Sequence, residues 1–263
     1  MIISFFPGFE GDENFFQFEP ITPEIFEKLR NAKAVIFPPT VSPELYYSVK
    51  NMGIPVFPEY DLRFRYPGKL GQHLLLSTLK LPRPFSILIP RLCGIEENPY
   101  ARKLEIFYPF VLKGNYGDEG TEVFLVKSPE EFREKLKLVK SWERSGRFGF
   151  IIQEYIDTPF DARAIVIGKK VFVFFREGGF KKNIVREGNP IPCPKKGLKK
   201  RVKDLVDKFV ELTGFNLVAI DILFKKDRPL INEFNFVFGR RLIGEKKYEQ
   251  YLKKAIKEFL SNI

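Results

Sequence analysis

Near the carboxyl end of this 263-residue chain, two apolar runs flank a short polar turn and together predict a β-hairpin. The runs are Leu217 to Phe224 and Pro229 to Phe236, and the turn between them reads KKDR. Strand-length runs rich in β-branched and aromatic residues, joined by a short polar segment, are typical of antiparallel pairing. Because a hairpin fixes the register of its strands, it also fixes which side chains share a face.

Three oxygen-bearing side chains interrupt these apolar strands. A turn centred near Asp227 places Asp221 roughly opposite Glu233, and the period of two puts Asn235 beside Glu233. Two opposed carboxylates repel by up to about 1 kcal/mol, so this face needs a compensating cation, either magnesium or a nearby lysine. Hard oxygen ligands suit magnesium. The alternative is a solvent-facing polar stripe on an antiparallel sheet.

The rest of the chain predicts an α/β protein with α+β lobes. Strands at 1–6, 33–37 and 54–57 alternate with helices at 23–32 and 43–52, whose caps are Thr22 and Ser42. A helix at 69–80 has Leu70, Leu74 and Leu75 on one face. Beyond it we expect strands at 85–89, 110–113, 122–126, 148–155, 161–167 and 170–175. We also expect a helix capped by Ser128, with Glu131 as its capping-box residue, and helices at 199–213 and at 246–260.

The segment PFVLKGNYGDEGTEV is a candidate phosphate loop. Lys113 ends its first strand, and three glycines follow closely, at Gly114, Gly117 and Gly120. Glycines let backbone amides approach phosphate oxygens, and a lysine ammonium offsets their charge. A glycine-rich hairpin loop without a ligand is the alternative, and Asp118 and Glu119 add negative charge there.

Two further segments carry candidate binding groups. In IIQEYIDTPFDARAIVIG an apolar strand leaves through Gln153 and Glu154, and such an exit offers backbone groups to an adenine edge. Basic and amide side chains then form a candidate anion clamp, comprising Arg163, Arg176, Lys181, Lys182 and Asn183. Guanidinium groups stabilise charge on a transferring phosphoryl group. Solvated surface charges are the alternative for both segments.

The order of these motifs over residues 69–239 resembles that of the ATP-grasp superfamily, and more narrowly of the RimK-type ligases. YPGKLGQHLLL, followed by LPRP, is similar to the lysine-led helix of that family. The resemblance implies a small pre-ATP-grasp domain at 1–68 and two lobes enclosing the nucleotide, at 69–154 and 155–263. The loop with Asp118 and Glu119, and the lack of a proline before the glycine in INEFNFVFGRR, depart from the family pattern.

The same resemblance implies roles for individual residues. It gives nucleotide binding to Lys69, Lys113, Gly117, Gly120, Gln153, Glu154, Tyr155, Ile156 and Asp161, with Asp161 on the ribose side. It gives contacts to the phosphate and acyl phosphate to Arg163, Arg176, Lys182 and Asn183. It assigns the binding of magnesium to Asp221, Glu233 and Asn235.

The implied activity is ATP-dependent joining of a carboxylate to an amine through an acyl phosphate. The cofactors are ATP and magnesium, with two ions expected and manganese as the substitute. The expected partners are small-molecule or peptide acids and amines, rather than nucleic acid or a membrane. The sequence does not decide between a monomer and a homo-oligomer. Two rivals remain: an ATP-grasp protein with another phosphoryl acceptor, and a non-catalytic basic protein that binds nucleotide or nucleic acid.

Composition narrows these options. A formal charge of +11 and a pI near 9.5 favour anionic partners. Cys93, Cys193 and the single His73 are too few and too dispersed for a zinc site. The absence of a long apolar run and of a basic leader favours a cytoplasmic protein. Abundant Lys, Arg and Glu with few Gln, Met and His are typical of heat-adapted proteins.

Overall fold

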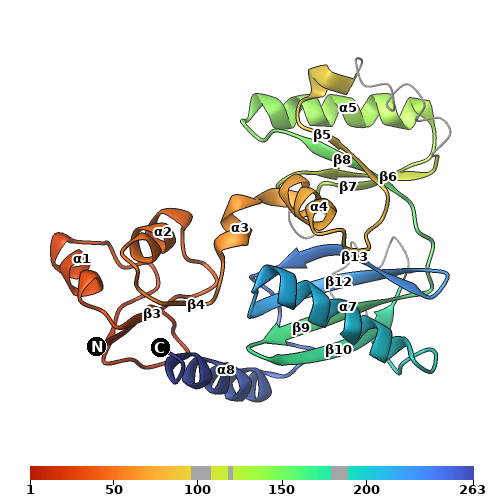
Figure 1. Ribbon diagram of the computed structural model, residues 1–263. Helices are drawn as coiled ribbons and strands as arrows, with labels where there is room; N and C mark the ends of the chain where they lie inside the picture. The colour runs from red at the N-terminus through yellow and green to blue at the C-terminus, as the bar shows by residue number, and fades with distance from the viewer. Residues whose placement is uncertain (96–107, 118–120, 179–188) are drawn as a thin grey trace.

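The computed structural model describes residues 1–95, 108–117, 121–178 and 189–263 and holds one sheet in each of the three predicted lobes. The mixed α/β architecture confirms the predicted fold class. Among the described helices, none has the length and apolarity needed to cross a bilayer. In Figure 1 the middle lobe lies above the carboxyl-terminal lobe, and both chain ends lie at the amino-terminal lobe.

The amino-terminal lobe is a parallel sheet with the order β2-β1-β3-β4. Its strands are β1 (Ile2–Ser4), β2 (Glu13–Asn14), β3 (Ala34–Ile36) and β4 (Val56–Phe57). The connecting helices are α1 (Pro23–Arg30) and α2 (Pro43–Asn51). Thr22 Oγ1 and Ser42 Oγ each accept a bond from the backbone N–H three residues on, which confirms both predicted caps.

A short α3 (Asp61–Arg65) and then α4 (Gly68–Thr78) lead into the middle lobe. The buried residues of α4 are Gly71, His73, Leu75 and Leu76, whereas Leu74 is 51% exposed. The leucines predicted to share one face of this helix therefore differ in burial. Since α4 packs between two sheets (Figure 1), its buried face is wider than one stripe of leucines and includes the polar His73.

The middle lobe is an antiparallel sheet with the order β5-β8-β6-β7, backed by one long helix. The helix is α5 (Pro129–Arg144), which is capped by Ser128, and the strands are β5 (Ser86–Ile89), β6 (Phe110–Gly114), β7 (Val123–Val126) and β8 (Phe150–Glu154). A 3₁₀ turn, η1 (Leu92–Ile95), follows β5. Alternate residues of the strands, such as Phe110, Leu112 and Ile152, form a core with Val139 and Trp142 of α5. By the strand period, Val111, Lys113 and Gln153 lie on the opposite face.

The carboxyl-terminal lobe is an antiparallel sheet with the order β11-β10-β9-β12-β13. Its strands are β9 (Phe160–Ile167), β10 (Lys170–Glu177), β11 (Pro190–Ile191), β12 (Leu217–Lys225) and β13 (Arg228–Asn235). Two helices belong to it, α7 (Leu198–Thr213) and α8 (Glu245–Leu260). β12 and β13 confirm the predicted hairpin.

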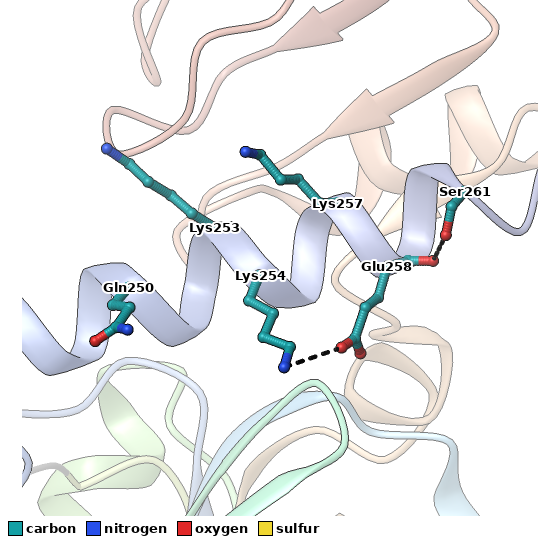
Figure 2. Close-up of a pocket in the computed structure, with 6 residues that line it drawn as sticks. All are labelled: Gln250, Lys253, Lys254, Lys257, Glu258 and Ser261. Carbon is teal, nitrogen blue, oxygen red and sulfur yellow. Dashed lines mark hydrogen bonds and ion pairs between the residues drawn. The ribbon is translucent and has the colours of Figure 1, made fainter.

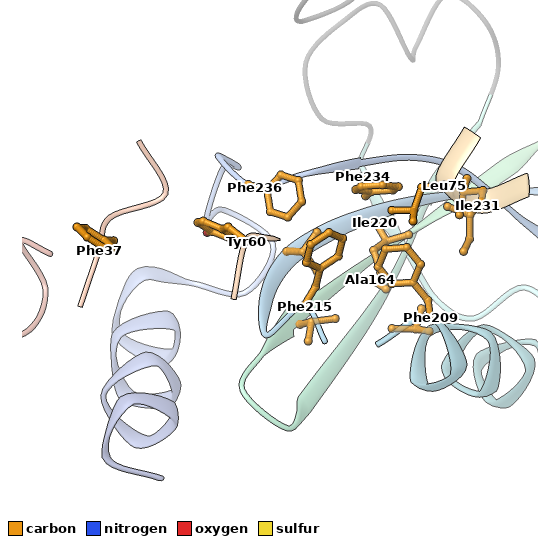
Figure 3. Packing of buried hydrophobic residues seen from close by; sticks show 14 of the residues in the cluster. Phe37, Tyr60, Leu75, Ala164, Phe209, Phe215, Ile220, Ile231, Phe234 and Phe236 are labelled. Carbon is orange, nitrogen blue, oxygen red and sulfur yellow. The ribbon is translucent and has the colours of Figure 1, made fainter. Parts of the chain in front are cut away.

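The two faces of this last sheet have different partners. One face packs against α7 in a core rich in phenylalanine, in which Phe209 and Phe215 contact Phe234 of β13 (Figure 3). On the other face, apolar residues such as Ile165 and Leu217 pack against Leu252 and Ile256 of α8. The strand period places Asp161, Arg163 and Asp221 on this second face, at the end that α8 leaves uncovered.

Candidate active site

The predicted metal ligands of the hairpin share one face of the carboxyl-terminal sheet. Asp221 on β12 is directly opposite Glu233 on β13, which confirms the predicted register. Asn235 Nδ2 lies 3.4 Å from Glu233 Oε1, so these two side chains are also neighbours. Carboxylate and amide oxygens gathered in this way match the donors that magnesium prefers.

Two arginines neutralise Asp221. Arg163 Nε donates to Asp221 Oδ1 at 2.9 Å and Arg163 Nη2 donates to Oδ2 at 2.8 Å. Arg176 Nη2 also donates to Asp221 Oδ1, at 2.8 Å. Burial alone raises the pKa of a carboxyl, but Arg163 and Arg176 together hold the pKa of Asp221 below its ordinary value. The sequence predicted magnesium or a lysine as the compensating cation, whereas two arginines of the same sheet supply compensating charge to Asp221.

Asp161 belongs to the same ionic network. Its Oδ1 accepts a 2.7 Å bond from Arg176 Nε, and Asp161 and Arg176 are only 4% and 7% exposed. Since Arg176 bonds both Asp161 and Asp221, four charged side chains form a continuous chain across β10, β9 and β12. The ribose contact predicted for Asp161 stays a prediction, because the described contacts of its carboxylate are to Arg176.

The middle lobe contributes two lysines to the opposite side of the site. Lys113 Nζ donates to Asn232 Oδ1 of β13 at 2.8 Å, which joins the two lobes directly. The pKa of Lys113 is lowered to about 8, chiefly by burial; Glu233 and Asp221 oppose the shift, and Lys69 adds to it. Lys69, Glu233 and Asp221 are therefore the charged groups that act on the Lys113 ammonium.

Lys69 is held against the candidate phosphate loop. Its Nζ donates to the carbonyl of Gly117, and its backbone N–H donates to Asn115 O at 3.0 Å. The buried Glu122 lies under this loop and pairs with Arg147. A Cβ at Gly114 or Gly117 would overlap the side chain of Glu122, so both positions require glycine.

The predicted adenine segment lies at the end of β8. Gln153 is 2% exposed, and its Nε2 has no hydrogen-bond partner within the described residues. Glu154 is already engaged, since Oε1 accepts from Phe85 N at 2.9 Å and Oε2 pairs with Lys225. Tyr155 donates to Asp157 at 3.2 Å, and Ile156 is half-buried. Gly120, Lys182 and Asn183 lie outside the described residues.

Three polar residues of the site were missed by sequence reasoning. Gln72 and His73 follow Lys69 at helical spacings of three and four, a signal that places them on its side of α4. Burial lowers the pKa of His73 to about 3, with Lys113 and Arg83 adding to the shift, so this imidazole is neutral near pH 7. Asn232 gave no such signal, because strict strand alternation points it away from Glu233.

A surface hollow along α8 contains none of the predicted site residues. It has a volume of about 470 Å³ and lies along α8, lined by Gln250, Lys253, Lys254, Lys257, Glu258 and Ser261 (Figure 2). Lys254 and Glu258 pair within it at 3.9 Å. The six lining residues include no predicted site residue, so we locate the site between the lobes.

The donor atoms of the site are oxygens, which are the ligands that magnesium prefers. Glu233 and Asn235 offer oxygens on one face, and Asp221 would share its oxygens with the two arginines. Within the described ranges, no cluster of three or more His, Cys, Asp or Glu side chains is arranged to hold a metal.

Two lobes face the site. One carries lysines and a glycine loop, and the other carries carboxylates and arginines. This arrangement is typical of ATP-grasp proteins. The family model for the RimK-like ATP-grasp domain matches residues 72–258, which is more than half of the chain. The chain therefore belongs to the RimK-like ATP-grasp family, a finding that confirms the predicted family and supports a ligase that uses ATP.

Solved structures with the same fold include several ligases. A RimK domain protein of the ATP-grasp type from Sphaerobacter thermophilus is 18% identical with a TM-score of 0.60, over 86% of this chain and 81% of that one. A D-alanine–D-alanine ligase from Bacillus anthracis is 15% identical with a TM-score of 0.66, over 95% and 84%. An L-amino acid ligase from Bacillus licheniformis is 16% identical with a TM-score of 0.60, over 89% and 60%. By sequence, no curated protein matches this chain.

Proposed function

We propose that this protein joins a carboxylic acid to an amine, with ATP cleaved to ADP and phosphate through an acyl-phosphate intermediate. The observation that carries the proposal is the bond between Lys113 and Asn232 across the lobe boundary, directly beside Glu233 and its cross-strand partner Asp221. A triphosphate needs cations and metal-binding oxygens together, and this boundary offers both. Family membership and the ligases among structures of the same fold support the same reaction class.

In the first step an oxygen of the substrate carboxylate attacks the γ-phosphorus of ATP. The new oxygen–phosphorus bond forms while the bond between the γ-phosphorus and the bridging oxygen breaks, and ADP leaves. Lys69 and Lys113 hold phosphate oxygens from the middle lobe, and Arg163 and Arg176 face them from the other sheet. Fixed positive charges stabilise the negative charge that spreads over the transferring group.

In the second step the amine attacks the acyl carbon, and inorganic phosphate leaves with the electron pair of the broken carbon–oxygen bond. The amine nitrogen loses a proton to solvent or a nearby base. Magnesium held by Asp221, Glu233 and Asn235 would neutralise charge on the β- and γ-phosphates. The protein contributes orientation, charge and exclusion of water from the acyl phosphate.

The test is a phosphate-release screen over pairs of acids and amines with ATP and magnesium. We expect one class of pairs to release phosphate only when acid and amine are both present, and Glu233→Gln to reduce that rate about 100-fold or more. Phosphoryl transfer to a hydroxyl compound without any amine would instead favour the kinase-like alternative. Full activity of Glu233→Gln would refute the metal assignment.

A further inference from the structure

Asn232 lies at an irregularity in the site hairpin. Asp221 is opposite Glu233, yet the next pair is Ile222 with Ile231, so Asn232 is the extra residue of a β-bulge. Bulges next to functional sites re-aim side chains that strict alternation would point elsewhere. Here the bulge allows the side chains of Asn232 and of its neighbour Glu233 to serve the same lobe boundary.

Residues around this bulge are tied to the middle lobe and to α4. Ile231 N donates to Pro82 O at 2.9 Å, and Asn232 Oδ1 accepts from Lys113 Nζ at 2.8 Å. Gln72 then bonds both backbone groups of Phe234, accepting from its N–H at 3.1 Å and donating to its carbonyl at 2.8 Å. These bonds fix the separation of the lobes on both sides of Glu233.

The partner of the Lys113 ammonium is a neutral amide and not a carboxylate. Lys113 is 6% exposed, and a buried ammonium needs an acceptor. A carboxylate at position 232 would neutralise the ammonium, whereas the amide of Asn232 orients it and leaves its charge for an anionic ligand. The same amide keeps further negative charge away from Asp221 and Glu233.

We propose that Asn232 is a positioning residue for the triphosphate, holding the Lys113 ammonium across the lobe boundary without neutralising it. The inference rests on the proposed function in one respect, namely that the anion met by Lys113 is the phosphate chain of ATP. Asn232 acts through Lys113, so its effect is on the phosphates and not on the nucleoside.

The experiment compares binding of magnesium with the non-hydrolysable analogue AMP-PNP and binding of adenosine, by calorimetry on the full chain. We expect Asn232→Asp to weaken AMP-PNP binding about 10-fold or more and Asn232→Ala to weaken it about 3-fold to 10-fold. Adenosine affinity should change less than about 2-fold in both variants. Asn51→Asp, an exposed site with the same change in charge, is the matched control.

A second measurement tests the route through Lys113. In a Lys113→Met background, Asn232→Ala should cause almost no further loss of AMP-PNP affinity, because the group it positions is gone. Equal losses in both backgrounds, or a proportional loss of adenosine affinity, would overturn the role of Asn232. Wild-type protein that binds neither ligand would instead refute the proposed function, so the two failures are distinguishable.

Discussion

The two lobes that face the site hold their charges in opposite ways. In the carboxyl-terminal sheet Arg163 and Arg176 are bonded to Asp161 and Asp221, so the charges neutralise one another inside the fold. On the middle lobe, Lys113 is bonded to a neutral amide, and Lys69 to a backbone carbonyl. In the first arrangement each buried charge has a partner of opposite sign within the fold, whereas the second leaves the lysine charge without a fixed counter-ion among the described residues.

This contrast predicts that Asp221→Asn destabilises the fold, in addition to removing a proposed magnesium ligand. Removing one carboxylate leaves two buried guanidinium groups without their shared partner, so we expect a loss of about 3–5 kcal/mol in the free energy of unfolding. Urea denaturation measures it. Glu233→Gln is the control, since it changes charge by the same amount on the same face outside the network, and it should cost about 1 kcal/mol or less. Equal losses of unfolding free energy in the two variants would contradict the special role of Asp221 in the ionic network.

At the lobe boundary, His73 should make the protein sensitive to acid. Its pKa is about 3 in the fold against an ordinary value of 6.5, so the unfolded chain binds the proton more readily. Neutral His73 therefore does not lower the free energy of unfolding above pH 6.5. Below that pH the free energy of unfolding falls by about 1.4 kcal/mol per pH unit, until the pKa of the folded state is reached. We expect His73→Leu to flatten the dependence of unfolding free energy on pH between about 6.5 and 4. Parallel curves for the two proteins would contradict this.

On the middle lobe, Lys113→Met should affect binding more than folding. Loss of a charge-assisted bond to phosphate should weaken AMP-PNP binding about 10-fold to 100-fold. The free energy of unfolding should stay the same or rise, because the fold disfavours the buried ammonium. Wild-type binding should also weaken above about pH 8, where this ammonium loses its proton. Calorimetry and urea denaturation measure the two quantities separately.

The smallest effect is expected in the hollow along α8. Lys254 and Glu258 are 61% and 41% exposed, so Lys254→Ala should change the free energy of unfolding by about 0.5 kcal/mol or less. AMP-PNP affinity should not change measurably. A large loss of affinity would place the nucleotide near α8 and contradict the location of the site between the lobes.

Much of the fold could be predicted from local patterns. The caps at Thr22, Ser42 and Ser128 and the hairpin register all depend on residues close in sequence, and the structure confirms them. The exposure of Leu74 could not be predicted in this way, because the burial of α4 depends on the two sheets around it. Periodicity within a helix contains no information about the number of its neighbours.

For the site, the sequence by itself determined the kinds of groups available and the pairing of Asp221 with Glu233. Tertiary structure decided which charges neutralise one another, that Lys113 bonds Asn232, and that Gln72 supports β13. The physical reason is that a bulge breaks the period of two, and contacts between lobes join residues more than 100 positions apart. Such contacts depend on how the sheets pack, which no local pattern specifies.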